Sequence, residues 1–187
     1  VLLHFGAVDW KAEVFVDEQL AGEHTGGYAP FSFDITDLLG KSRKHTLKLK
    51  VTDRTDKWFQ PRGKQVSEPG GIWYTVVTGI WQTVWLEPVT PSYVKNYYVV
   101  SDIDNAQMTV EVDAETAEGD VVKVAVLDGG VGYSAENPSS AVLAVAVVND
   151  GKTVIKIDDM KTWSPDLPYL YGVKVWIERK GKVVDSV

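Results

Sequence analysis

Aromatic residues concentrate in one glycine-rich stretch of the sequence, between residues 58 and 79, where they could contact a sugar. The rings in or next to this stretch include Trp58, Trp73, Tyr74 and Trp81. Sugars present C–H faces that pack against aromatic rings, whereas their hydroxyl groups need polar partners. The polar side chains that could serve in the same stretch are Arg62, Lys64 and Gln65. This combination favours part of a carbohydrate pocket.

The same rings have a second interpretation, in which they only pin the loop to its own β-sandwich. For Trp81 and Trp85, which lie near or inside a predicted strand, we favour this packing role. For Trp73 and Tyr74 both interpretations stay open. The candidate substrate-binding residues are therefore Trp73 and Tyr74, with Arg62 and Lys64 as their polar partners.

Other kinds of active site lack the residues that they need. The chain has no cysteine, which excludes disulfides, thiolate metal sites and a cysteine nucleophile. Its three histidines, His4, His24 and His45, form no short-spaced pair of the kind that binds zinc. No Gly-x-Ser-x-Gly motif occurs, and nothing singles out two of the 26 carboxylates as an acid–base pair. We expect no catalytic residue, no metal site and no cofactor in this chain.

Charge and hydropathy exclude two further classes of partner. The net charge of −7 over 187 residues offers no electrostatic footprint for a phosphate backbone, so we expect no nucleic-acid partner. The longest apolar stretches, such as residues 141–148, are far shorter than the roughly 20 residues of a membrane helix, so we expect no membrane partner.

The elements that must position these side chains are strands. Apolar residues alternate with polar ones along most of the chain, as in 11–16, 47–51, 108–113 and 173–178. These runs are short, rich in Val, Ile, Thr, Tyr and Trp, and bounded by turn residues. Only residues 35–39 suggest a short helix or turn. The fold class is therefore all-β, with antiparallel strands arranged in sandwiches.

Two prolines within four residues predict a domain boundary. Pro88-Val89-Thr90-Pro91 ends the strand over 83–87 and stiffens the link that follows. We therefore expect one domain over 1–89 and a second over 90–187. The second has six or seven strand-like runs, the size of an immunoglobulin-like sandwich. The loop over 58–79 in the first domain is long, and long loops in compact domains are usually functional.

Three blocks in the correct order resemble a known family. The first comprises residues 3–16 (LHFGAVDWKAEVFV) and 22–36, the second residues 70–87 (GGIWYTVVTGIWQTVWLE), and the third residues 162–171 (TWSPDLPYLY). Together they resemble glycoside hydrolase family 2, which includes β-galactosidases, β-glucuronidases and β-mannosidases. The resemblance implies a galactose-binding-like jelly roll over 1–89, followed by an immunoglobulin-like sandwich over 90–187.

The resemblance also implies what the chain lacks. Enzymes of this family carry their two catalytic glutamates on a TIM barrel after the second sandwich, one of them in an Asn-Glu dipeptide. The chain has no such dipeptide and no βα repeats, and it opens inside a predicted strand without an initiator methionine. We expect an N-terminally truncated jelly roll in a front-end fragment of a retaining glycosidase, inactive alone. Its partners would be the missing barrel and a terminal β-linked sugar.

The resemblance also implies one functional role for this chain. In the family, the last loop of the first domain helps to shape the sugar pocket, and the resemblance places residues 70–74, with Trp73 and Tyr74, in that loop. Two other hypotheses stay open: a stand-alone carbohydrate-binding or adhesion module, and an interaction protein whose aromatic loop grips another protein. An open sheet edge in the first domain would also favour self-association.

Overall fold

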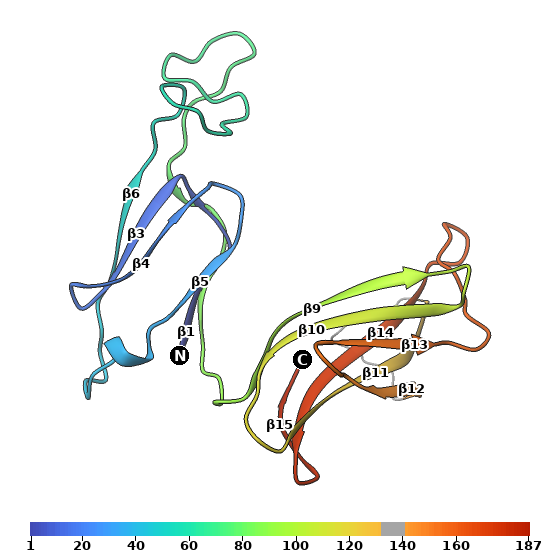
Figure 1. The fold of residues 1–187 in the computed structure, drawn as a ribbon. Coiled ribbons are helices and arrows are strands. Elements are labelled where there is room, and N and C mark those ends of the chain that lie inside the picture. The colour runs from blue at the N-terminus through green and yellow to red at the C-terminus, as the bar shows by residue number, and fades with distance from the viewer. Residues whose placement is uncertain (132–140) are drawn as a thin grey trace. The chain divides into compact units, whose positions relative to one another are not determined.

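The chain folds into two compact β-sheet units (Figure 1). The computed structural model describes residues 1–131 and 141–187, and of Gly130 and Val131 only the backbone. Unit 1 comprises Val1–Val89 and unit 2 comprises Thr90–Val187. All strand pairs between named strands are antiparallel in the described part of the chain. The predicted all-β fold class is confirmed.

Unit 1 is built from two three-stranded sheets and a short two-stranded one, with the orders β5-β1-β8, β4-β3-β6 and β2-β7. Its strands are β1 (Leu2–Phe5), β2 (Val8–Asp9), β3 (Lys11–Val16), β4 (Gln19–Thr25), β5 (Phe31–Asp34), β6 (Leu47–Thr52), β7 (Gly79–Ile80) and β8 (Val84–Glu87). A single 3₁₀ turn over Thr36–Leu38 lies where the sequence predicts a short helix or turn.

The core of unit 1 lies between its two three-stranded sheets. Period-two alternation places one side of β1 and one side of β3 in this core. The buried cluster comprises Leu3, Phe5, Val8, Ala12, Val14, Val16 and Ile35. Phe5 is fully buried, and its ring stacks on that of Phe31 with centroids 4.8 Å apart. The two sheets therefore form a sandwich that one continuous apolar cluster stabilises.

Replacing Gly22 by alanine is expected to destabilise unit 1 by about 1 to 2 kcal/mol. A Cβ atom at Gly22 in β4 would lie 2.2 Å from Cε1 of Phe33, so the ring would have to move. Gly40→Ala is the matched control, because a Cβ atom there meets nothing within 4 Å. Urea unfolding of the two variants checks this prediction, and equal midpoints would contradict it.

Unit 2 is a sandwich of a three-stranded sheet, β13-β10-β9, and a four-stranded sheet, β12-β11-β14-β15. Its strands are β9 (Tyr93–Asp102), β10 (Gln107–Glu115), β11 (Asp120–Val131), β12 (Val142–Val147), β13 (Lys152–Lys156), β14 (Tyr169–Arg179) and β15 (Lys182–Ser186). These described strands match in number a seven-stranded immunoglobulin-like sandwich.

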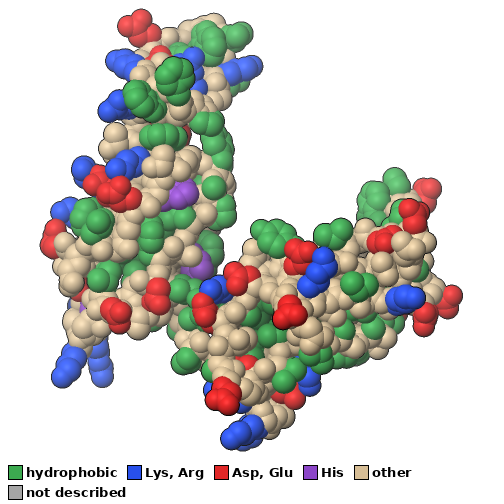
Figure 2. Space-filling view, viewed as in Figure 1, with side chains coloured by type: hydrophobic (Ala, Val, Ile, Leu, Met, Phe, Trp, Pro, Cys, Tyr) green, Lys and Arg blue, Asp and Glu red, His purple; other side chains and the backbone are tan. Residues whose placement is uncertain are grey.

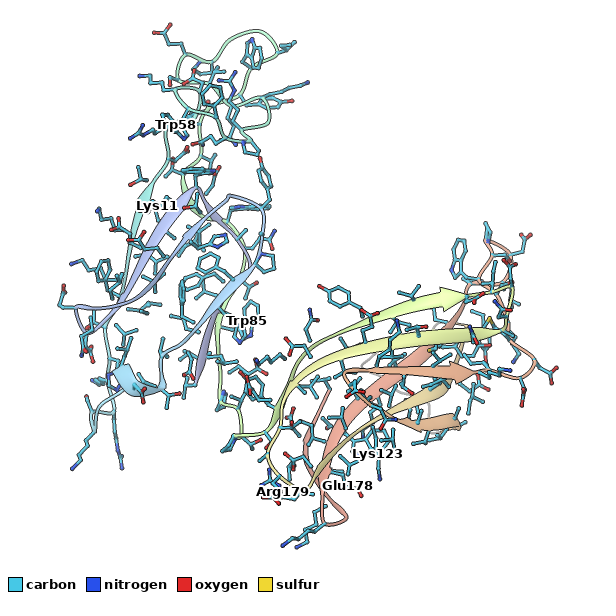
Figure 3. All side chains as sticks on the ribbon, in the orientation of Figure 1. Lys11, Trp58, Trp85, Lys123, Glu178 and Arg179 are labelled. Carbon is cyan, nitrogen blue, oxygen red and sulfur yellow. The ribbon has the colours of Figure 1, made fainter. Side chains whose placement is uncertain are left out.

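The core of unit 2 joins the inner faces of both sheets. Met108 and Val110 of β10 pack in one buried cluster with Val124 of β11 and Ile177 of β14. An ion pair links two neighbouring strands of the four-stranded sheet: Lys123 Nζ of β11 lies 2.9 Å from Glu178 Oε2 of β14 (Figure 3). No helix in the described ranges is long and apolar enough to cross a membrane.

Candidate functional site

A long loop connects β6 to β7 and projects from one end of unit 1 (Figure 1). We call residues 53–78 the aromatic loop. The Asp53 carboxylate holds both ends of this loop: it accepts hydrogen bonds from the backbone N–H of Thr55 at 2.6 Å, Nε2 of Gln60 at 2.6 Å and Oγ1 of Thr78 at 2.8 Å. The loop is therefore closed by one side chain at the end of β6.

Further hydrogen bonds stabilise the interior of the aromatic loop. Asp56 accepts from the backbone and side chain of Ser67, at 3.1 and 2.6 Å. Oε1 of Gln65 accepts from the backbone N–H of Val77 at 2.6 Å. The loop is thus long, but hydrogen bonds join its segments to one another. Such a loop can present side chains in fixed positions.

The four predicted substrate-binding residues all lie in the aromatic loop, and the structure brings them together in two pairs. The guanidinium carbon of Arg62 lies 5.9 Å from the ring centroid of Trp73, within the range of a cation–π contact. The backbone N–H of Tyr74 donates to the carbonyl oxygen of Lys64 at 2.7 Å. The side chains of Trp73 and Tyr74 are 43% and 64% exposed, so both rings can be reached by a ligand.

Other aromatic residues of the loop face solvent as well. Trp58 and Phe59 meet edge to face, and the guanidinium carbon of Arg54 lies 4.9 Å from the Trp58 ring centroid. Figures 2 and 3 show hydrophobic and basic side chains mixed at this end of unit 1, with Trp58 labelled in Figure 3. Flat rings beside cationic donors are the combination that sugars and other polar ring compounds can use.

Trp81 directly follows β7, whereas Trp85 lies within β8, and both rings make defined contacts with the rest of unit 1. Nε1 of Trp81 donates to the carbonyl oxygen of Gly27 at 2.7 Å. Trp85 stacks on His4, with centroids 4.7 Å apart. Both rings nevertheless remain more than 40% exposed. They are thus fixed by the sandwich on one side and open on the other.

A small pocket lies at the base of the aromatic loop and includes residues that the sequence did not indicate. It has a volume of about 250 Å³ and is lined by Asp9, Tyr28, Gln65, Val77, Gly79 and Trp81. Asp9 lies in β2, directly opposite Gly79 of β7. Val8 and Asp9 are consecutive and both are buried, whereas alternation predicts that one of the two faces solvent. The pattern of the sequence therefore carried no signal for a buried Asp9.

The pKa values of the two aspartates near the base of the loop, Asp9 and Asp53, are shifted in opposite directions. Burial raises the pKa of Asp9 above its usual range, and the negative charge of Asp53 raises it further. Burial also acts to raise the pKa of Asp53, but its hydrogen bonds from Thr55, Thr78 and Gln60 outweigh burial and lower it. Asp53 is therefore satisfied as a carboxylate, whereas Asp9 is not.

The aromatic loop and the pocket at its base offer a binding surface. In the part of the chain that the structure describes, no three carboxylate or imidazole side chains come close enough to hold a metal ion. The exposed rings and cationic groups of the aromatic loop can bind and orient a ligand, and Asp9 can donate or accept at the base of the pocket.

A family model covers more than half of the chain. The model of the glycosyl hydrolases family 2 matches residues 92–187, which includes nearly all of unit 2.

Curated relatives extend the similarity to both units. A β-galactosidase from Thermoanaerobacter pseudethanolicus is 29% identical over 195 residues, which covers all of this chain and 25% of that protein. A β-glucuronidase from Bacteroides fragilis is 25% identical over 194 residues, which covers all of this chain and 28% of that protein. The chain thus spans about a quarter of the length of these relatives.

Solved structures share the fold across the whole chain. A β-glucuronidase from Ruminococcus gnavus, crystallised with a C6-substituted uronic isofagomine, superposes with a TM-score of 0.72 at 19% identity. A putative β-galactosidase from Bacteroides fragilis gives the same TM-score at 20% identity. In both cases all of this chain is covered, against 31% and 29% of the other chain.

Proposed function

Because this chain belongs to glycosyl hydrolase family 2, we propose that it is the non-catalytic front part of a larger glycosidase. Unit 1 acts as a sugar-binding-like jelly roll and unit 2 as the immunoglobulin-like sandwich that follows it. The catalytic carboxylates lie outside this chain, in the barrel that the family resemblance implies. The whole enzyme would hydrolyse a terminal β-linked sugar with retention, through one nucleophilic carboxylate and one acid–base carboxylate.

The role of this chain in that reaction is to form part of the wall of the sugar pocket. The observation that carries this proposal is the pair of exposed rings, Trp73 and Tyr74, held by a cross-linked loop next to Arg62. A ring surface stacks on the C–H face of a sugar, and the guanidinium donates to its hydroxyl groups. Such contacts orient the substrate but move no proton and break no bond.

The size of the natural protein tests the first half of the proposal. An immunoblot of the source cells, with antiserum to this chain, should show a band several times larger than 20.7 kDa. A band near 20.7 kDa would contradict it and support a stand-alone carbohydrate-binding module.

Trp73→Ala in the complete enzyme tests the second half. We expect KM for an aryl β-glycoside to rise by roughly tenfold, with a smaller change in kcat, because stacking contributes about 0.5–1.5 kcal/mol to binding. Phe59→Ala is the matched control, since Phe59 lies on the same loop and is 95% exposed. Equal effects of the two substitutions would contradict a specific role for Trp73.

The isolated chain provides an independent check. We expect it to bind methyl β-galactoside no better than in the millimolar range, because one wall of a pocket buries little of a sugar. Micromolar binding that is lost on Trp73→Ala would overturn the scaffold proposal in favour of the binding module.

A further inference from the structure

The pocket at the base of the aromatic loop ends on a carboxyl group that lacks a partner. Asp9 is only 9% exposed, and its Oδ1 atom accepts no hydrogen bond from the residues in 1–131 and 141–187. An unpartnered buried carboxyl is costly, because the protein must either desolvate its charge or keep it protonated. Buried polar groups of this kind call for a missing partner as their explanation.

The backbone at Gly27 passes unusually close to the Asp9 carboxyl group. A Cβ atom on Gly27 would lie 2.6 Å from Asp9 Oδ1, so only glycine lets the segment after β4 pass this near to the carboxyl. The carbonyl oxygen of the same Gly27 accepts the Trp81 indole N–H at 2.7 Å, which fixes the ring beside the pocket. The same short segment therefore leaves room for the carboxyl and fixes the Trp81 ring beside it.

Two aromatic rings form a corner of the pocket. The rings of Tyr28 and Trp81 meet edge to face, with centroids 5.9 Å apart and an interplanar angle of 73°. Both are about half exposed, so their remaining faces are open to a ligand. The negatively charged face of an aromatic ring attracts a cation, and tryptophan does so best.

The pocket has a negative neighbour. The charge of Asp53 repels a negative charge on Asp9 and, after burial, adds to the rise in the pKa of Asp9. A neutral sugar would leave this negative charge uncompensated. A cation would pair with the carboxylate and with both ring faces at once.

We propose that the pocket formed by Asp9, Tyr28, Gln65 and Trp81 binds a guanidinium group. A guanidinium is planar, so it can stack on Trp81 while its N–H groups donate to the Asp9 carboxylate. An ammonium can also donate hydrogen bonds to the carboxylate and attract a ring face, but it has no flat face that could stack on Trp81. This inference does not rest on the proposed sugar surface, because it uses none of Trp73, Tyr74, Arg62 and Lys64.

Titration of the 187-residue chain with N-acetyl-arginine amide tests the proposal. In two-dimensional amide NMR, we expect saturable shifts of the Trp81 indole and Gly27 resonances, with a Kd of about 1 mM. N-acetyl-citrulline amide is the matched ligand control, because its ureido group has nearly the same shape and no charge. It should cause no saturable shift at the same concentrations.

Asp9→Asn is the matched protein variant. It keeps the shape of the side chain, removes the buried charge, and should raise the Kd for N-acetyl-arginine amide at least about tenfold. Asp37→Asn, on the exposed 3₁₀ turn, should leave the Kd unchanged. Should Asp9→Asn fail to fold, Trp81→Leu provides the second test, because it removes the ring and should also weaken binding.

Four outcomes would overturn the proposal. They are the absence of saturable shifts with N-acetyl-arginine amide, equal binding of the citrulline analogue, an unchanged Kd in Asp9→Asn, and stronger shifts of the same resonances by methyl β-galactoside. The last would identify the pocket as a sugar site instead. None of them bears on the Trp73 experiment, so the two proposals can fail separately.

Discussion

Phe5→Ala is expected to lower the free energy of unfolding of unit 1 by about 3–5 kcal/mol, the usual cost of removing a buried phenylalanine ring. Phe5 is fully buried, and it stacks on Phe31 within the cluster that joins the two sheets of unit 1. Removal of the ring would leave a cavity between the two sheets, and movement of one sheet alone could not fill it. Because whole domains are commonly stable by only about 5–15 kcal/mol, this one change would bring unit 1 near unfolding.

Urea titration followed by amide NMR measures this effect separately in each unit. Resonances of unit 1 should lose their native positions at lower urea in Phe5→Ala, while those of Val110 and Val124 in unit 2 should not move. Ile177→Ala is the reciprocal variant, since Ile177 is fully buried in the core of unit 2. A parallel loss of both units in either variant would contradict independent domains over 1–89 and 90–187.

Asp53→Ala is expected to release the aromatic loop. The substitution removes the acceptor of hydrogen bonds from Thr55, Gln60 and Thr78, and bonds to charged groups contribute about 1.5–3 kcal/mol each. A local loss of about 2–3 kcal/mol corresponds to roughly 30- to 150-fold faster amide exchange within residues 53–78. Hydrogen exchange measures it, and Asp37→Ala on the exposed 3₁₀ turn is the control.

The pH dependence of amide protection in the aromatic loop is a second test of the role of Asp53. The pKa of Asp53 is lowered in the folded chain, so its contribution is present above the unfolded pKa of about 3.9. That contribution is lost as pH falls through the folded pKa, because protonation removes the acceptor charge. The protection factors of the loop amides, which are corrected for the intrinsic pH dependence of exchange, should therefore fall in acid in the native chain, and Asp53→Ala should abolish that fall. An unchanged acid response in the variant would assign it to another group.

The secondary structure and the family could be read from the sequence because both are encoded locally. Alternation in runs such as 11–16 and 173–178 predicts strands, and β3 and β14 contain these runs. The family resemblance rested on three short blocks, and the match of the family model to residues 92–187 confirms it. The aromatic loop was also visible, since its glycines, prolines and rings interrupt the period of two.

The contacts within the candidate sites were decided only by the tertiary structure. Thr78 meets Asp53 across 25 positions of sequence, and Trp81 meets Gly27 across 54. Alternation predicts which side of a strand a residue faces. It does not predict which strand pairs with it, because pairing depends on how all strands of the unit pack and on the geometry of their turns. Asp9 shows the consequence. The sequence pattern did not single out Asp9, and only the approach of Gly27 and Trp81 made its carboxyl the buried end of a pocket.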